Sequence, residues 1–339
     1  MFWYNQFNNM LKRLLGITQE PQLIVYKSFG SLESFEITGK VCEKYKMVDR
    51  EQTSIKENVL QLFCAYFAKP LSSQEVHILY RNKEVTTKTN NRGMFTVSFH
   101  VDAIDLDQDS EWIDVPVSLV KTGDTEVAQV LLEGRDNTFG IISDIDDTVL
   151  VTEVTHKIKL LILMIMKNAY TRTMFVGVSD FYKALVLGKE GTNSNPIFYV
   201  SSSHWNLYSF LNSFMKHNKL PEGPLLLKEF SGIRGFVKGM SDHTHKQKKI
   251  ERILETYPDL PFILIGDSGQ HDAELYSKIV SRYPQRILAI YIRDVTKHED
   301  KLVIQAKEQL KDVVPLIEIV NTQEAIEDAQ RRGFIAKKK

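Results

Sequence analysis

The pattern of hydrophobic and polar positions changes twice along the chain. In the first 21 residues, apolar side chains fall at helical spacing and form one stripe within residues 2–15. From residue 22 onward, short runs of β-branched and aromatic residues alternate with turn-forming clusters such as residues 89–93. After residue 135, the order becomes strand, helix, strand. The pattern predicts an amphipathic helix (1–21), a β-rich domain (22–134), an α/β domain (135–330) and a solvated basic tail (331–339).

The β-rich domain is predicted to be an antiparallel β-sandwich, because several short strands with turns between them are typical of that fold. The predicted strands are residues 35–41, 59–67, 75–80, 94–101 and 115–120. No cluster of titratable residues in this domain resembles a catalytic site. A role in recruiting a partner therefore stays open for it.

The α/β domain contains continuous apolar runs instead of alternating ones, which indicates strands covered on both faces and hence a parallel, Rossmann-like sheet. The predicted strands are residues 139–143, 197–201, 225–227, 262–266, 287–292 and 315–320, with helices at 205–216, 246–257, 273–280 and 299–311. An insertion at about residues 149–196 is long enough to form a helical cap over the site. Its apolar stretch, residues 158–166, is interpreted as buried in the cap, at a dimer contact or against acyl chains.

Composition narrows the protein class. The 339 residues carry 43 basic and 43 acidic side chains, and 43% of the residues are hydrophobic, as in globular proteins. The longest apolar run, residues 160–166, is too short to span a bilayer. Only Cys42 and Cys64 are present, which excludes a disulfide framework and predicts a reducing, cytoplasmic setting. Basic residues outnumber acidic ones in residues 137–339, which favours an anionic ligand in that part of the chain. The sequence has no pattern of aromatic and basic residues typical of a nucleic-acid-binding groove, so nucleic acid is not expected as a partner.

Acidic and hydroxyl side chains follow the predicted parallel strands. The first strand ends in Ser143-Asp144-Ile145-Asp146-Asp147-Thr148, the second in Ser201-Ser202-Ser203, and a later one in Gly266-Asp267 with Asp272 close behind. The carboxyl ends of parallel strands meet at one edge of a sheet, so these side chains should converge. Several carboxylates at short range repel one another unless a cation joins them, and all-oxygen ligands suit Mg²⁺. Ser202 and Ser203 are interpreted as caps of the helix at 205–216.

These motifs resemble the haloacid dehalogenase superfamily of phosphohydrolases, whose four motifs occur here in order: Asp144-x-Asp146-x-Thr148, Ser201, Lys246 and Gly266-Asp267-x4-Asp272. The runs SDIDDTV (143–149), YVSSSHWNLY (199–208) and ILIGDSGQHD (263–272) further resemble the catalytic domain of the actin-patch-type phosphatidate phosphatases. The resemblance covers roughly residues 135–295. His204 departs from it, because that family's second motif has proline at this position.

The residues and the resemblance together assign roles to the motif side chains. Asp144 is the expected nucleophile, and Asp146 the expected general acid and base. Ser201 is expected to hydrogen-bond a phosphoryl oxygen, and Lys246 to neutralise charge on the phosphoryl group. Lys248 and Lys249, on the same helix as Lys246, are interpreted as solvated.

The remaining expectations concern a Mg²⁺ site and the residues that hold its ligands and the neighbouring loop in place. Asp144, Asp267 and the backbone carbonyl of Asp146 are the expected Mg²⁺ ligands. Asp272 is expected to hold either the metal's water shell or Lys246. Thr148 is expected to fix the loop after the nucleophile. Asp147 is interpreted as an ordinary loop residue.

The resemblance implies hydrolysis of phosphatidate to diacylglycerol and phosphate through an aspartyl-phosphate intermediate. Two alternatives stay open: a phosphatase of the same superfamily that acts on a soluble phosphate, and a binding protein. A lipid substrate requires contact with a membrane surface, and the stripe in residues 2–15 is the candidate for peripheral attachment, with Lys12 and Arg13 meeting anionic lipid. The alternative for the stripe is a helix docked on its own protein.

Overall fold

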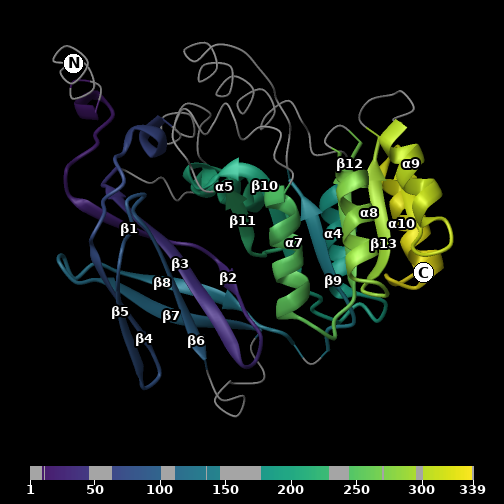
Figure 1. Cartoon of the computed structure of the whole chain (residues 1–339), viewed down its shortest axis with the longest axis horizontal. Coiled ribbons are helices and arrows are strands. Elements are labelled where there is room, and N and C mark those ends of the chain that lie inside the picture. Colours follow the sequence, from purple (N-terminus) through teal and green to yellow (C-terminus); the bar gives the residue numbers. More distant parts are fainter. Residues whose placement is uncertain are drawn as a thin grey trace. The chain divides into compact units, whose positions relative to one another are not determined.

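The computed structural model describes residues 10, 12–45, 63–100, 111–134, 136–145, 177–228, 244–268, 271–294 and 301–337. These residues belong to two compact units. Figure 1 shows the chain coloured from its amino to its carboxyl end. The first unit comprises the described parts of Met1–Leu132 together with His204–Phe214. The second comprises those of Glu133–Ser203 and Met215–Lys339. Among the described helices, none combines the length and the apolar character that a bilayer crossing requires.

Two sheets build the first unit (Figure 1). One has the order β1-β3-β6, formed by Pro21–Val25, Ser34–Glu43 and Met94–His100. The other has the order β2-β8-β7-β4-β5, formed by Ser28–Phe29, Thr125–Leu131, Trp112–Leu119, Glu75–Tyr80 and Lys83–Lys88. The described pairs are antiparallel except β2 with β8, which is parallel.

Alternation along the strands creates the core of this unit. In β6, Phe95, Val97 and Phe99 are buried, and the residues between them are exposed. Successive side chains of a strand point to opposite faces, so one face of the strand is apolar. Ile37 of β3 and Val117 of β7 belong to the same buried cluster, which therefore joins the two sheets. Full burial of one such side chain contributes about 1.5–3 kcal/mol.

One strand predicted in this domain is wrong over its described part. Residues 63–67 are helical, and residues 59–62 lie outside the described part of the chain. The Ala68 amide donates to the Cys64 carbonyl at 2.8 Å, a bond of helical spacing. The rings of Phe63 and Phe67 stack with centroids 6.3 Å apart. Aromatic residues four positions apart lie on one face of a helix and also on one face of a strand, so this spacing does not distinguish the two structures.

The segment His204–Phe214 belongs to the first unit, although its sequence position lies within the predicted α/β domain. The ring of Trp205 stacks on Tyr26 with centroids 4.2 Å apart and an angle of 22° between the planes. Lys40 Nζ donates to Asn206 Oδ1 at 2.8 Å. Aromatic stacking and a largely buried hydrogen bond thus hold this segment against the strands of the first unit.

A six-stranded sheet with the order β11-β10-β9-β12-β13-β14 forms the centre of the second unit. The strands are β9 (Gly140–Asp144), β10 (Ile197–His204), β11 (Leu225–Lys228), β12 (Phe262–Asp267), β13 (Ile287–Arg293) and β14 (Leu316–Ile319). The pairs β10–β9, β9–β12, β12–β13 and β13–β14 are parallel. The strands β9 and β12 are buried up to their last residue, as their continuous apolar runs predict.

Helices pack around this sheet, and in Figure 1 α7 and α8 lie over its near face. These helices are α4 (Val178–Leu187), α7 (Thr244–Thr256), α8 (Asp272–Arg282), α9 (Lys301–Leu310) and α10 (Thr322–Arg332). A further helix, α5 (Tyr208–His217, after the 3₁₀ turn Trp205–Leu207), belongs to the first unit up to Phe214. Helix α8 contacts β12, β13, α7 and α9.

Helix α4 lies inside the predicted cap segment but packs against the sheet layer. Its Phe181 meets the ring of Tyr291 in β13 edge to face at 5.7 Å. The Tyr291 hydroxyl donates to Asp328 of α10 at 3.0 Å, and Arg331 and Arg332 pair with the same carboxylate. The start of the predicted basic tail is therefore part of α10. The segment available for a cap narrows to residues 149–176, which lie outside the described residues.

A buried amide fixes the chain just before β10. Asn195 Oδ1 accepts hydrogen bonds from the backbone amides of Thr138 at 2.9 Å and Phe139 at 3.3 Å. Its Nδ2 donates to the Leu185 carbonyl at 2.9 Å. One side chain thereby joins the end of α4 to the residues that lead into β9. Each partner would be left buried without its bond if the amide were removed.

We expect Asn195→Ala to destabilise the second unit by about 2–4 kcal/mol, because several backbone groups lose a buried partner together. The midpoint of urea-induced unfolding, followed by circular dichroism, measures the loss. Thr192→Ala changes an exposed residue of the same loop and is the matched control, expected to unfold like the wild type. A loss below about 0.5 kcal/mol, the range of ordinary surface substitutions, would contradict this account of Asn195.

Candidate active site

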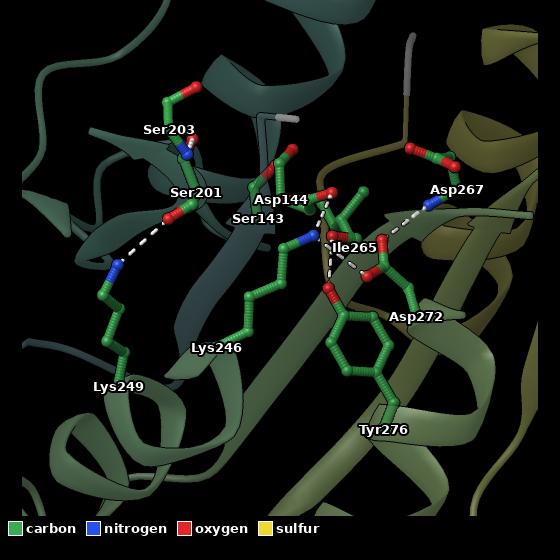
Figure 2. Close-up of polar contacts among 10 residues, drawn as sticks. All are labelled: Ser143, Asp144, Ser201, Ser203, Lys246, Lys249, Ile265, Asp267, Asp272 and Tyr276. Carbon is green, nitrogen blue, oxygen red and sulfur yellow. Dashed lines mark hydrogen bonds and ion pairs between the residues drawn. The ribbon is translucent and has the colours of Figure 1, made fainter. Parts of the chain in front are cut away.

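Three carboxylates meet at the carboxyl end of the central sheet, as Figure 2 shows. Asp144 is the last residue of β9, Asp267 is the last of β12, and Asp272 is the first of α8. The strands β9 and β12 are neighbours in the sheet, so their ends lie side by side. Each side chain offers an oxygen, and these oxygens all lie within 4.8 Å of one another. The structure therefore confirms the prediction that these three aspartates lie close together.

A buried lysine lies between two of the carboxylates. Lys246 comes from α7, and its side chain is only 3% exposed. Its Nζ lies 2.9 Å from Asp144 Oδ2 and 3.3 Å from Asp272 Oδ1. A buried charge is stabilised mainly by neighbouring opposite charges, because water inside the protein neither solvates nor screens it well. Among these four side chains, the three carboxylates outnumber the one ammonium group.

The backbone of β12 is shaped to receive Asp272. The Asp267 amide donates to Asp272 Oδ2 at 3.1 Å. A Cβ atom on Gly266 would lie only 2.6 Å from that same oxygen, so a side chain at this position would displace the carboxylate. His271, directly before Asp272, has a φ of 63°, a conformation that non-glycine residues seldom adopt. The glycine and this turn together direct Asp272 toward Lys246.

The buried Tyr276 and the partly buried Tyr182 brace the strand ends, and sequence reasoning did not assign them a role. Tyr276 OH donates to the Ile265 carbonyl at 2.9 Å, and burial together with the nearby carboxylates raises its pKa well above the usual value. Tyr182 OH shares a 2.7 Å hydrogen bond with Ser143 Oγ, and burial raises its pKa to about 12. Both stay protonated in neutral solution and act as hydrogen-bonding groups beside Asp144. The position of Tyr276, one helical turn after Asp272, was the available signal.

Ser201 lies on β10, the strand beside β9, and is buried. Its Oγ accepts a hydrogen bond from the Ser203 amide at 2.9 Å, and its carbonyl accepts one from Lys249 Nζ at 3.0 Å (Figure 2). The reading of Lys249 as solvated is therefore wrong. The helix-cap prediction for Ser202 and Ser203 is wrong too, because β10 continues through them. The turn that follows has His204 as its N-cap, with no side-chain capping bond.

The other predicted groups lie partly outside the described residues. Asp146, Asp147 and Thr148 belong to the stretch that is not described, as do the predicted apolar segments 2–9 and 158–166. The contacts of Asp146 and Thr148 therefore stay predictions.

The donor set suits a hard divalent cation. Asp144, Asp267 and Asp272 provide only oxygen ligands, and Mg²⁺ prefers one or two carboxylates with water and phosphate oxygens in the remaining positions. Lys246 already engages one oxygen each of Asp144 and Asp272. The residues present thus fit Mg²⁺, with Asp144 and Asp267 as the carboxylates at the two strand ends.

Comparison with known proteins identifies the same segment. Residues 139–294 match the family model described as phosphatidate phosphatase APP1, catalytic domain. The chain is 34% identical over 171 residues to phosphatidate phosphatase APP1 of Saccharomyces cerevisiae, which is 48% of this chain and 28% of the yeast protein. It is 32% identical over 165 residues to the uncharacterized protein C29B5.04c of Schizosaccharomyces pombe, covering 47% of this chain and 26% of that protein. The chain thus spans less than a third of the length of these relatives.

The following two solved structures have low similarity to this chain. A carbohydrate acetylesterase from Xanthomonas citri is 8% identical over 89% of this chain and 69% of its own, with a TM-score of 0.31. A β-glucuronidase from Ruminococcus gnavus is 8% identical over 89% of this chain and 63% of its own, with a TM-score of 0.25. Such scores carry no argument about fold or function.

The matched segment contains Asp144, Ser201, Lys246, Asp267 and Asp272, the residues that the geometry gathers at the ends of neighbouring strands. The resemblance seen in the sequence motifs is thereby confirmed: residues 139–294 match the catalytic domain of phosphatidate phosphatase APP1.

Proposed function

We propose that the protein is a Mg²⁺-dependent phosphomonoester hydrolase whose substrate is phosphatidate and whose products are diacylglycerol and inorganic phosphate. The observation that carries the proposal is the buried Lys246 between Asp144 and Asp272, with Asp267 beside them. Such a set of groups binds a phosphoryl group next to a carboxylate nucleophile. The match of residues 139–294 to that catalytic domain supports phosphatidate as the substrate.

The chemistry proceeds in two displacements. A carboxylate oxygen of Asp144 attacks phosphorus, the bond from phosphorus to the leaving oxygen breaks, and Asp146 gives that oxygen a proton. Water then attacks phosphorus of the aspartyl-phosphate, Asp146 takes its proton, and Asp144 is released with inorganic phosphate. Lys246 holds Asp144 in place and balances negative charge as the phosphoryl group arrives. Mg²⁺, when bound, would supply additional positive charge that offsets the negative charge on the phosphoryl oxygens.

The proposal includes a fold: a haloacid dehalogenase-type core in the second unit, a helical cap from residues 149–176, and a β-sandwich in the first unit. The parallel sheet with a nucleophile at the end of β9 supports the core. The shared apolar cluster of the two sheets supports the sandwich.

Attachment at a membrane surface belongs to the same proposal, because phosphatidate lies in bilayers. The described part of the amino-terminal stripe has exposed apolar side chains at Met10 (54%) and Leu14 (74%). Lys12 differs from its predicted role, since its Nζ lies 2.5 Å from Glu43 Oε2 and both side chains are largely buried. The apolar side of the stripe is therefore the part that would enter the interface.

Removal of divalent cations should abolish turnover. We expect EDTA to lower hydrolysis of p-nitrophenyl phosphate at least about 100-fold, since the carboxylates around Asp144 would repel the phosphate. Added Mg²⁺ should restore the rate. Phosphate release measures the effect, and circular dichroism should show an unchanged fold. Full activity in EDTA would contradict a metal-dependent site.

Replacement of the nucleophile should stop the reaction while the fold persists. We expect Asp144→Asn to reduce kcat by about 10³-fold or more, because an amide oxygen cannot form the covalent intermediate. Lys246 keeps Asp272 as a partner in this variant. Asp180→Asn, an exposed carboxylate of α4, is the matched control and should retain the wild-type rate. Comparable rates for Asp144→Asn and wild type would exclude the covalent mechanism.

Binding to vesicles should depend on the amino-terminal stripe. We expect the full chain to co-sediment with phosphatidate-containing vesicles, and Leu14→Glu or deletion of residues 1–16 to lose most of that binding. Both variants should still hydrolyse p-nitrophenyl phosphate, which separates attachment from catalysis. Equal sedimentation of all three proteins would exclude the stripe as the anchor.

A further inference from the structure

Helix α7 sends two lysines, one turn apart, to different parts of the site (Figure 2). Lys246 reaches the carboxylates at the end of β9 and the start of α8. Lys249, three positions later, extends toward β10. Residues three apart lie on one face of a helix, so α7 fixes the spacing between the two ammonium groups. The mechanism above uses Lys246 and gives no role to Lys249.

Lys249 joins two neighbouring strands. Its Nζ donates to the Ser201 carbonyl of β10 at 3.0 Å and to the Leu226 carbonyl of β11 at 2.5 Å. The two strands are neighbours in the sheet. Both acceptors are backbone oxygens, so Lys249 acts on the position of the main chain. Hydrogen bonds from a charged donor are stronger than those between neutral groups, which makes this contact a firm restraint on the Ser201 peptide.

A local hydrogen bond within β10 orients the Ser201 hydroxyl. Ser203 N donates to Ser201 Oγ at 2.9 Å, so this oxygen serves as an acceptor. A hydroxyl can accept one hydrogen bond and donate another, so this bond is compatible with donation to a phosphoryl oxygen. The direction of the hydroxyl proton depends on where the Ser201 backbone lies. The backbone carbonyl next to it is the one that Lys249 holds.

We propose that Lys249 is a positioning residue that fixes Ser201 for hydrogen bonding to a phosphoryl oxygen, acting through the Ser201 carbonyl. The inference rests on the proposed phosphatase function and adds a residue to it. A phosphoryl oxygen is present in both substrate and product, so the contact serves binding of phosphate in both. Loss of Lys249 should therefore weaken phosphate affinity more than it slows the chemical step.

The test compares variants of the full chain in the presence of Mg²⁺. We expect Lys249→Met to raise KM for p-nitrophenyl phosphate, and the inhibition constant of inorganic phosphate, about tenfold each, with kcat changed less than about threefold. Lys249→Arg, which keeps charged donors, should recover most of the affinity. Lys248→Met is the matched control, because Lys248 is the exposed neighbour on the same helix, and it should match the wild type.

A second comparison shows whether Lys249 acts through Ser201. In a Ser201→Ala background, Lys249→Met should add less than about a twofold change in KM, because the hydroxyl that it positions is gone. A full additional loss in that background would overturn the inference, as would a Lys249→Met enzyme with wild-type KM and phosphate inhibition. Should Lys249→Met fail to fold, Lys249→Gln removes the charge and shortens the side chain, and we expect it to raise KM and the inhibition constant of inorganic phosphate in the same direction.

Failure of the proposed function gives a different result. A wild-type protein without turnover of any phosphomonoester, and without binding of inorganic phosphate in calorimetry, would overturn the phosphatase proposal and the role of Ser201 with it. A wild-type protein that turns over substrate, combined with an unaffected Lys249→Met variant, would overturn only the role of Lys249.

Discussion

The buried ammonium of Lys246 is the group on which the rest of the site depends. It lies within 3.3 Å of two carboxylates that come from different elements, β9 and α8. Removing the ammonium would leave both carboxylates without this compensating charge, which is costly in a region poorly reached by water. The surrounding features serve this arrangement: a glycine at 266 leaves room for Asp272, and the hydroxyl of Tyr276 ties α8 to the strand that ends beside it.

Much of the second unit could be predicted from the sequence, because burial on both faces leaves a direct mark on the pattern of residues. Continuous apolar runs gave the strands at 139–143 and 262–266, and the aspartates that follow them do meet. The run at 59–67 had the same composition of apolar and aromatic residues, but its described end is helical. A short apolar run does not specify its own backbone state, since tertiary contacts decide between the two.

The functions of individual polar side chains were less predictable. Lys248 and Lys249 are identical residues in neighbouring positions, yet one is exposed and the other joins β10 to β11. The two side chains differ in surroundings because successive residues of a helix point about 100° apart around its axis, and only the direction of Lys249 faces β10 and β11. Likewise, Ser203 was interpreted as a helix cap because the end of β10 cannot be seen in composition. Tyr182 and Tyr276 bind backbone or serine oxygens that only the folded sheet brings to them.

The strand β10 has a further consequence for the architecture of the chain. It begins in the second unit and ends at His204, where the chain joins the first unit for eleven residues before it returns. A cut between Leu132 and Glu133 therefore does not separate two self-sufficient modules. A fragment beginning at Glu133 would contain Trp205 without Tyr26, its stacking partner, and would expose an aromatic face prone to association. Part of the packing surface of the β-rich unit is thus encoded inside the segment 139–294.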